Sequence, residues 1–278
     1  MSPLVFTLLV AAGSFGAGFL GSLVGMGGGV VIVPMLVVLM GIDVHYAMGA
    51  ALVSVIATSS GAASAYVKEG FTNLRIGMFL EVATTIGALV GATLVQYLPA
   101  RIISLIFGLF LAYTTWSSLH PPPDGAITEA VDPLAERLKL RGHYPTAEGP
   151  QPYHGRRVLG GFGVMFIAGN LSGLLGAGAG AFKVIAMDQV MRLPFKVSTT
   201  TSNFMIGVTA AASAGIYLSH GYIDAALAAP VTLGVLGGSF IGARILPGTR
   251  SGRLRLLFAG VTAVLAIEMI FRGVRGGL

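Results

Sequence analysis

Lys183 follows one phenylalanine after a run of glycine and alanine in an apolar stretch, GNLSGLLGAGAGAFKVIAMDQ at 169–189. A buried charge costs free energy unless it is paired, so a lysine here points to a function. Glycine lets a ligand approach the backbone amides, and a helix that begins after it offers free N–H groups and positive potential. This combination predicts an anion site. The alternatives are a snorkelling lysine or a structural partner of Glu81 or Asp188.

A similar glycine pattern, GMGGG, lies at 25–29. We expect both glycine breaks to bind the substrate, through Gly25, Gly27, Gly28, Gly29, Gly176, Gly178 and Gly180. In KVSTTTSN at 196–203, Thr201, Ser202 and Asn203 could donate to an anion; the alternative is a helix cap at Ser198 followed by hydroxyls that bond their own backbone. Glu81 could titrate in a proton-coupled cycle, or it could pair with a basic residue.

Enzyme chemistry has little support in the sequence. There is no cysteine, and the five histidines fall in or beside loops without metal-ligand spacing, so we expect no catalytic residue, no metal and no cofactor. GAGAG resembles part of a dinucleotide fingerprint, but no strand precedes it. The net charge of +6 comes from basic residues between apolar runs, which argues against nucleic acid as a partner.

The elements that must position these residues are membrane helices. Of the 278 residues 54% are hydrophobic and 10% charged, and the mean hydropathy is +0.83, whereas soluble domains carry about 25% charged residues. Several apolar runs approach the roughly 20 residues that cross a bilayer. They do not alternate as barrel strands do. We expect an all-α polytopic protein in the cytoplasmic membrane, with the lipid bilayer and a small anion as its partners.

The chain contains an internal repeat. An offset of 151 residues places 15–92 on 166–243 without a gap, and identical pairs include Phe15/Phe166, Thr58/Thr209, Tyr66/Tyr217, Gly87/Gly238 and Gly91/Gly242. Each half is expected to contain a helical hairpin, broken at its glycines, and three spanning helices. The first repeat, 1–119, has its hairpin at 4–40 and helices at 44–67, 74–98 and 101–119. The second, 158–278, has its hairpin at 158–192 and helices at 196–219, 225–246 and 253–271.

The charge distribution predicts an inverted arrangement of the two repeats. If the second half is inverted, 13 basic residues collect on one side, within 68–75, 137–157, 192–196 and 244–255, and only Arg101, Arg272 and Arg275 collect on the other. The positive-inside rule then puts both termini outside and the polar connector, 120–157, in the cytoplasm. We expect the connector to be an exposed linker with one short helix near 132–140. Tyr66 and Tyr217, near helix ends, are expected to be interface anchors.

The paired motifs GSLVGMGGGVVIVPML and GLLGAGAGAFKVIAM resemble the two signature motifs of the sulfite exporter TauE/SafE family of membrane permeases, and STTTSN follows the second at a similar place. The resemblance covers essentially the whole chain. In the second motif Ala179 replaces the middle glycine and no proline follows at the matching place. The resemblance implies transport of small sulfur oxyanions or organosulfonates, such as sulfite or sulfoacetate, without enzymatic chemistry. A passive anion channel and, less favoured, a membrane-embedded enzyme are the alternatives.

Overall fold

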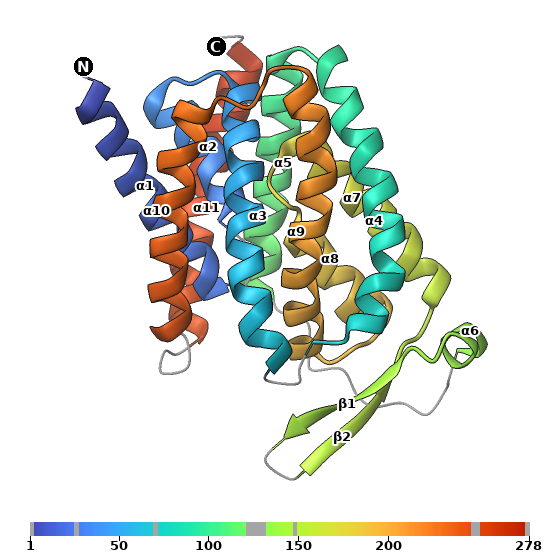
Figure 1. Cartoon of the computed structure of the whole chain (residues 1–278). Coiled ribbons are helices and arrows are strands. Elements are labelled where there is room, and N and C mark those ends of the chain that lie inside the picture. Colours follow the sequence, from blue (N-terminus) through green and yellow to red (C-terminus); the bar gives the residue numbers. More distant parts are fainter. Residues whose placement is uncertain are drawn as a thin grey trace.

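The computed structural model describes residues 3–24, 28–68, 72–120, 132–146, 149–245 and 251–275. Helices make up most of it (Figure 1). The first half contains α1 (Pro3–Val24), α2 (Gly29–Met40), α3 (Val44–Lys68), α4 (Leu74–Leu94), the 3₁₀ turn η1 (Val95–Tyr97) and α5 (Ala100–Leu119). The second contains α7 (Val158–Leu175), α8 (Gly180–Ile185), the π-helical turn η2 (Ala186–Val190), α9 (Phe195–Ser219), α10 (Ala225–Ile245) and α11 (Ser251–Arg275).

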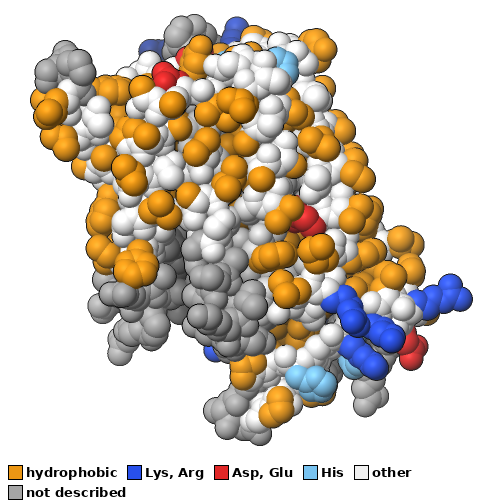
Figure 2. Space-filling view, viewed as in Figure 1, with side chains coloured by type: hydrophobic (Ala, Val, Ile, Leu, Met, Phe, Trp, Pro, Cys, Tyr) orange, Lys and Arg blue, Asp and Glu red, His pale blue; other side chains and the backbone are white. Residues whose placement is uncertain are grey.

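The helical body has the surface of a membrane protein. Within the described ranges, five helices are long and apolar enough to cross a bilayer, over Leu4–Gly21, Leu74–Tyr97, Ala100–Ser117, Val158–Leu175 and Ala225–Gly242. Large apolar side chains such as Leu159 and Leu233 are about 70% exposed. Figure 2 shows hydrophobic side chains spread over the face of the body in view, with most of the visible Lys and Arg beside the β-hairpin. Such a surface is stable in lipid, because lipid tails solvate apolar side chains.

The helices of the two halves pack against each other in matched pairs. α1 packs on α10 and α4 on α7, while α5 packs on α11 and α3 on α9. In the α5–α11 pair, Gly273 lies beside Arg101 and Leu105, and Thr115 Oγ1 lies 2.8 Å from Thr262 Oγ1. Rising numbers in one helix thus meet falling numbers in the other, so α5 and α11, which the 151-residue offset superposes, run antiparallel.

Glycine allows the closest of these helix contacts. A Cβ on Gly87 of α4 would collide with the carbonyl oxygen of Phe166 in α7. One on Gly238 of α10 would collide with that of Phe15 in α1, at the position that the repeat makes equivalent. Small residues at such faces let backbones approach until dispersion and weak polar contacts hold the helices together. Close packing is therefore the reason for glycine at Gly87 and Gly238.

The connector is folded, whereas the sequence predicted an exposed linker with one short helix. α6 (Pro133–Arg137) is followed by an antiparallel hairpin of β1 (Arg141–Thr146) and β2 (Gly149–His154). The pairing runs from Arg141 opposite His154 to Thr146 opposite Gly149, with Pro145 opposite Pro150. Proline lacks the N–H that a central strand needs, but both strands here are edges of a two-stranded sheet, where proline is tolerated.

Hydrogen bonds fasten the connector to the helical body. The Asp132 carboxylate accepts from the amides of Leu134 (2.8 Å) and Val158 (2.9 Å), so it caps α6 and also holds the start of α7. The bond from Val158 is the largest cause that lowers the pKa of Asp132. At the start of α4, Asn73 Nδ2 donates to the Tyr153 hydroxyl of β2 at 2.8 Å. The connector therefore holds the adjoining ends of α4 and α7.

Candidate functional site

The second glycine break, residues 176–180, is a left-handed turn buried between helices. Gly176 has φ 63°, Gly178 φ 76° and Ala179 φ 42°. A Cβ on Gly176 would lie 2.7 Å from Met48 Cβ, and one on Gly178 would lie 2.8 Å from Ile206 Cγ2. Glycine is thus required at both positions by conformation and by space. Ala179 adopts a left-handed conformation that non-glycine residues rarely take.

The first glycine break meets the second one. Gly25 and Gly27 lie outside the described residues, but Gly28 and Gly29, where α2 begins, are buried. A Cβ on Gly29 would lie 3.0 Å from the carbonyl oxygen of Ala177 and 2.9 Å from Val55 Cγ2. Val55 of α3 also lies beside Gly178. Because Gly29 has no side chain, the start of α2 can contact the turn that leads into α8.

Lys183 is fully buried in the first turns of α8, which begins at Gly180. Its Nζ donates a short hydrogen bond to Thr209 Oγ1 in α9. The preceding ring, Phe182, stacks on Phe110 and Tyr113 of α5, with centroid distances of 5.5 and 4.9 Å. α8 is only six residues long and continues as the π-helical η2 rather than as a regular helix. The aromatic stack and the Thr209 bond hold this short helix, and hence the lysine, in place.

Glu81 completes a chain of polar groups with Lys183. It is 5% exposed in α4, and its Oε1 accepts from Thr209 Oγ1 at 2.6 Å and from Thr85 Oγ1 at 3.2 Å. One threonine hydroxyl can accept from an ammonium while it donates to a carboxylate. The structure thus connects Lys183 to Glu81, one of its two expected partners, through Thr209. The three residues Lys183, Thr209 and Glu81 are called the relay below.

The polar side chains of α9 that were expected to bind the anion form hydrogen bonds with two different parts of the chain. Ser202 Oγ donates to the Gly180 carbonyl at the second break (3.3 Å), whereas Thr201 Oγ1 accepts from the Asn73 amide at the start of α4 (3.1 Å). Asn203 is 9% exposed. Ser198 is not the helix cap, because α9 already begins at Phe195, after Pro194. Of these residues, Ser202 makes the hydrogen bond to the break.

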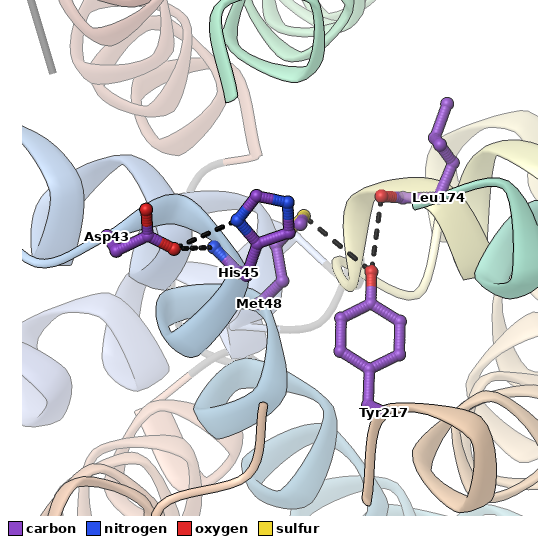
Figure 3. Close-up of polar contacts among 5 residues, drawn as sticks. All are labelled: Asp43, His45, Met48, Leu174 and Tyr217. Atoms are coloured by element: carbon purple, nitrogen blue, oxygen red, sulfur yellow. Dashed lines mark hydrogen bonds and ion pairs between the residues drawn. The ribbon is translucent and has the colours of Figure 1, made fainter. Parts of the chain in front are cut away.

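Tyr217 corrects a prediction. Instead of anchoring at a lipid interface it is 1% exposed, and its hydroxyl can donate to the carbonyl of Gly173 (3.0 Å) or of Leu174 (3.3 Å) at the end of α7. The hydroxyl also lies 3.8 Å from Met48 Sδ (Figure 3). These carbonyls precede the second break, where the helix leaves them without intrahelical partners. Tyr217 therefore stabilises the end of α7; the side chain of its repeat partner, Tyr66, lies outside the described part.

Thr209 is a further site residue, which was not predicted from the sequence. Thr209 and Tyr217 were both among the positions identical between the two halves, at Thr58 and Tyr66. That identity was the signal that could have selected them from the other hydroxyl residues of α9. No group of three or more His, Cys, Asp or Glu residues that could hold a metal ion occurs in the described part of the chain.

Comparison with known proteins shows which family this helical chain is similar to. The family model described as "Sulfite exporter TauE/SafE" matches residues 10–269. The chain belongs to the sulfite exporter TauE/SafE family. Two similar proteins from Bacillus subtilis (strain 168) are named "Probable membrane transporter protein YunE", 26% identical over 97% of this chain and 98% of its own, and "Probable membrane transporter protein YdhB", 26% identical over 85% and 89%.

A third similar protein has the same kind of name. It is a "Probable membrane transporter protein" of Xylella fastidiosa (strain 9a5c), 25% identical over 96% of both chains. No solved structure matches this chain. The family, the names of these relatives and the apolar helices together support a multi-pass membrane transporter rather than an enzyme.

Proposed function

We propose that this protein is a secondary transporter of a small anion, a sulfur oxyanion or organosulfonate such as sulfite or sulfoacetate. The observation that carries the proposal is the complete burial of the Lys183 ammonium beside the second glycine break. An ionisable group inside a membrane protein is retained where it serves a substrate or ion pathway. The family description supplies the substrate class.

The anion is proposed to bind near the middle of the membrane, where the two breaks meet. Irregular backbone survives at this depth only when it is buried in protein or lines a cavity, and paired broken helices are the usual location of a transporter site. The proposed ligands are the amides of Gly25, Gly27, Gly28, Gly29, Gly176, Gly178 and Gly180, with Lys183, Thr201, Ser202 and Asn203. The short α8 has a small dipole of its own, so Lys183 supplies most of the positive charge.

The chain is further proposed to consist of two inverted repeats, with both termini outside the cytoplasmic membrane and 120–157 inside. The antiparallel course of α5 and α11 supports this arrangement. Figure 1 also supports it, since both termini lie at one end of the body and the β-hairpin lies at the other. The basic residues favour the hairpin end as the cytoplasmic one.

Counterflow in proteoliposomes tests the proposal. Vesicles that contain the purified protein and unlabelled sulfite or sulfoacetate should transiently accumulate the labelled anion from outside, because a carrier exchanges its cargo. A passive channel would let the label equilibrate without overshoot. The transporter proposal is wrong if neither anion enters faster than into protein-free vesicles.

A further inference from the structure

The relay joins the two halves of the protein through buried polar groups. Glu81 comes from α4 of the first half, and Lys183 and Thr209 come from α8 and α9 of the second. Thr209 is fully buried, like Lys183, and its hydroxyl has one proton. That proton can go to Glu81 Oε1 at 2.6 Å or to the Met205 carbonyl at 2.9 Å. The hydroxyl hydrogen can therefore rotate from one acceptor to the other while the Thr209 oxygen stays in place.

Both ends of the relay have unused bonding capacity. Glu81 Oε2 is buried and has no hydrogen-bond partner among the described residues. An ammonium group has three donors, and within the described ranges the bond from Lys183 Nζ goes to Thr209. A buried carboxylate oxygen without a partner is costly when it is charged. The acid oxygen can thus accept a proton, and the ammonium can bind a further acceptor.

Charge balance connects anion binding at Lys183 with protonation of Glu81. Without a ligand the buried relay holds one cation and one carboxylate, so its net charge is zero. An anion that binds Lys183 brings at least one negative charge into the same poorly solvated region. When two anionic groups share one cation in such a region, the ionised form of both is unfavourable in free energy, and one of them takes up a proton instead.

We propose that Glu81 takes up one proton from solvent, at Oε2, when the anion binds to Lys183, so that anion and proton are transported together. The inference rests on the proposed function and specifies its coupling ion. Lys183 then keeps its charge for the substrate, and Thr209 is the positioning residue that transmits the change between them. When Glu81 is neutral, the Thr209 hydroxyl can donate to the Met205 carbonyl.

The charged groups on the surrounding helices are few. α4 packs against α7 and α9. α8 packs against α7, α9 and η2, and its Phe182 stacks on α5. α7 contains no charged residue. Besides the relay, the charged residues of the other elements are Arg75 in the first turn of α4, Arg101 in the first turn of α5, Asp188 in η2 and Lys196 in the first turn of α9. The three cations lie in end turns. Of the two acids, Glu81 is the one that the hydrogen bonds through Thr209 connect to Lys183.

The relay occurs at one of two repeat-related positions. With the 151-residue offset, Lys183 corresponds to Ile32, Thr209 to Thr58, and Glu81 to Thr232. The equivalent set is thus uncharged, although Ile32 is as deeply buried as Lys183. Close packing by itself would call for similar residues in both halves. One charged set therefore predicts one proton for each transport cycle.

Calorimetry of sulfoacetate binding tests the proposal on the full-length protein in detergent. Both acid groups of sulfoacetate stay ionised near neutral pH, so protons taken up on binding must go to the protein. Titration in two buffers of different ionisation enthalpy should give an uptake of about one proton per anion, and the affinity should rise about tenfold per pH unit of acidification. Glu81→Gln should bind with an uptake near zero and without this pH dependence.

Controls separate the relay from general effects. Glu268→Gln removes an acid that is paired with Arg272 in α11 at 3.1 Å, and it should behave like the wild type. Thr209→Ser should keep the proton uptake, whereas Thr209→Val should reduce it. Zero uptake by the wild type, or an unchanged uptake in Glu81→Gln, overturns the coupling but leaves anion transport standing. Failure of the wild type to bind sulfoacetate or sulfite at any pH overturns both proposals.

Discussion

Lys183 has a structural role and a proposed functional role. In the structure its ammonium is bonded to Thr209, which bonds in turn to Glu81. In the proposed cycle the same ammonium binds the transported anion. Removal of one member of a buried charge pair leaves the other uncompensated, and this costs about 3–5 kcal/mol. Variants of Lys183 and Glu81 can therefore separate the contribution of Lys183 to stability from its contribution to anion binding.

We expect Lys183→Ala to lower the free energy of unfolding by about 3–5 kcal/mol, because the Glu81 charge loses its compensation. Glu81→Gln in the same chain should restore most of that loss without restoring anion affinity. Thermal unfolding in detergent measures the first quantity and calorimetry the second. If the double variant is no more stable than Lys183→Ala, the two residues are not coupled in the folded state.

The sequence indicated Lys183 and Glu81 because a charge in an apolar helix is conspicuous. It did not indicate that Thr209 joins them, because a single threonine in a helix rich in hydroxyl residues looks like a residue that bonds its own backbone. Tyr217 was misplaced for a related reason: aromatic residues near helix ends are typical of the lipid interface. Only tertiary packing, which brings α9 against α4 and α7, gives these side chains their roles.

At the scale of elements, the second glycine break is the part whose geometry is most restricted. Gly176 and Gly178 combine positive φ with neighbours less than 3 Å from a would-be Cβ. Any side chain there must distort the turn that sets the start of α8. Since Phe182 and Lys183 follow within that helix, such a distortion would displace the proposed anion ligand.

Gly178→Val should therefore abolish transport while the protein still inserts into the membrane, and Gly27→Val in the first break should do the same. Gly163→Val is a matched control in α7, because a Cβ there would meet no atom within 4 Å. Uptake by proteoliposomes and the amount of inserted protein measure the two effects. Wild-type transport by Gly178→Val and Gly27→Val would show that the glycine breaks do not form the site.

The connector and η2 mark the limits of the sequence analysis for secondary structure. The prolines favoured an exposed linker with one short helix, yet the connector also forms a two-stranded hairpin, whose edge positions require no amide at Pro145, Pro150 and Pro152. The stretch after Lys183 was expected to continue as helix, and nothing in AMDQV indicates the π-helical turn that the structure has at Ala186–Val190. The helical class itself followed from composition, since apolar runs of this length have few alternatives in lipid.

At the scale of the whole molecule, the proposed orientation can be tested without knowledge of the substrate. The chain contains no cysteine, so single cysteines can be introduced. Tyr97, between α4 and α5, is 76% exposed, and His143 lies exposed in the hairpin. An impermeant thiol reagent on intact cells should label Tyr97→Cys and leave His143→Cys unlabelled until the membrane is permeabilised. The reverse pattern would contradict the orientation.

The central claim, that Lys183 binds a transported anion, is tested most directly by initial uptake rates in proteoliposomes. At equal protein content, labelled sulfite or sulfoacetate should enter wild-type vesicles with saturable kinetics, while Lys183→Ala should fall to the rate of protein-free vesicles. Lys183→Arg should retain part of the rate, because the charge survives although its shape changes. Saturable uptake by Lys183→Ala at the wild-type rate would contradict the claim.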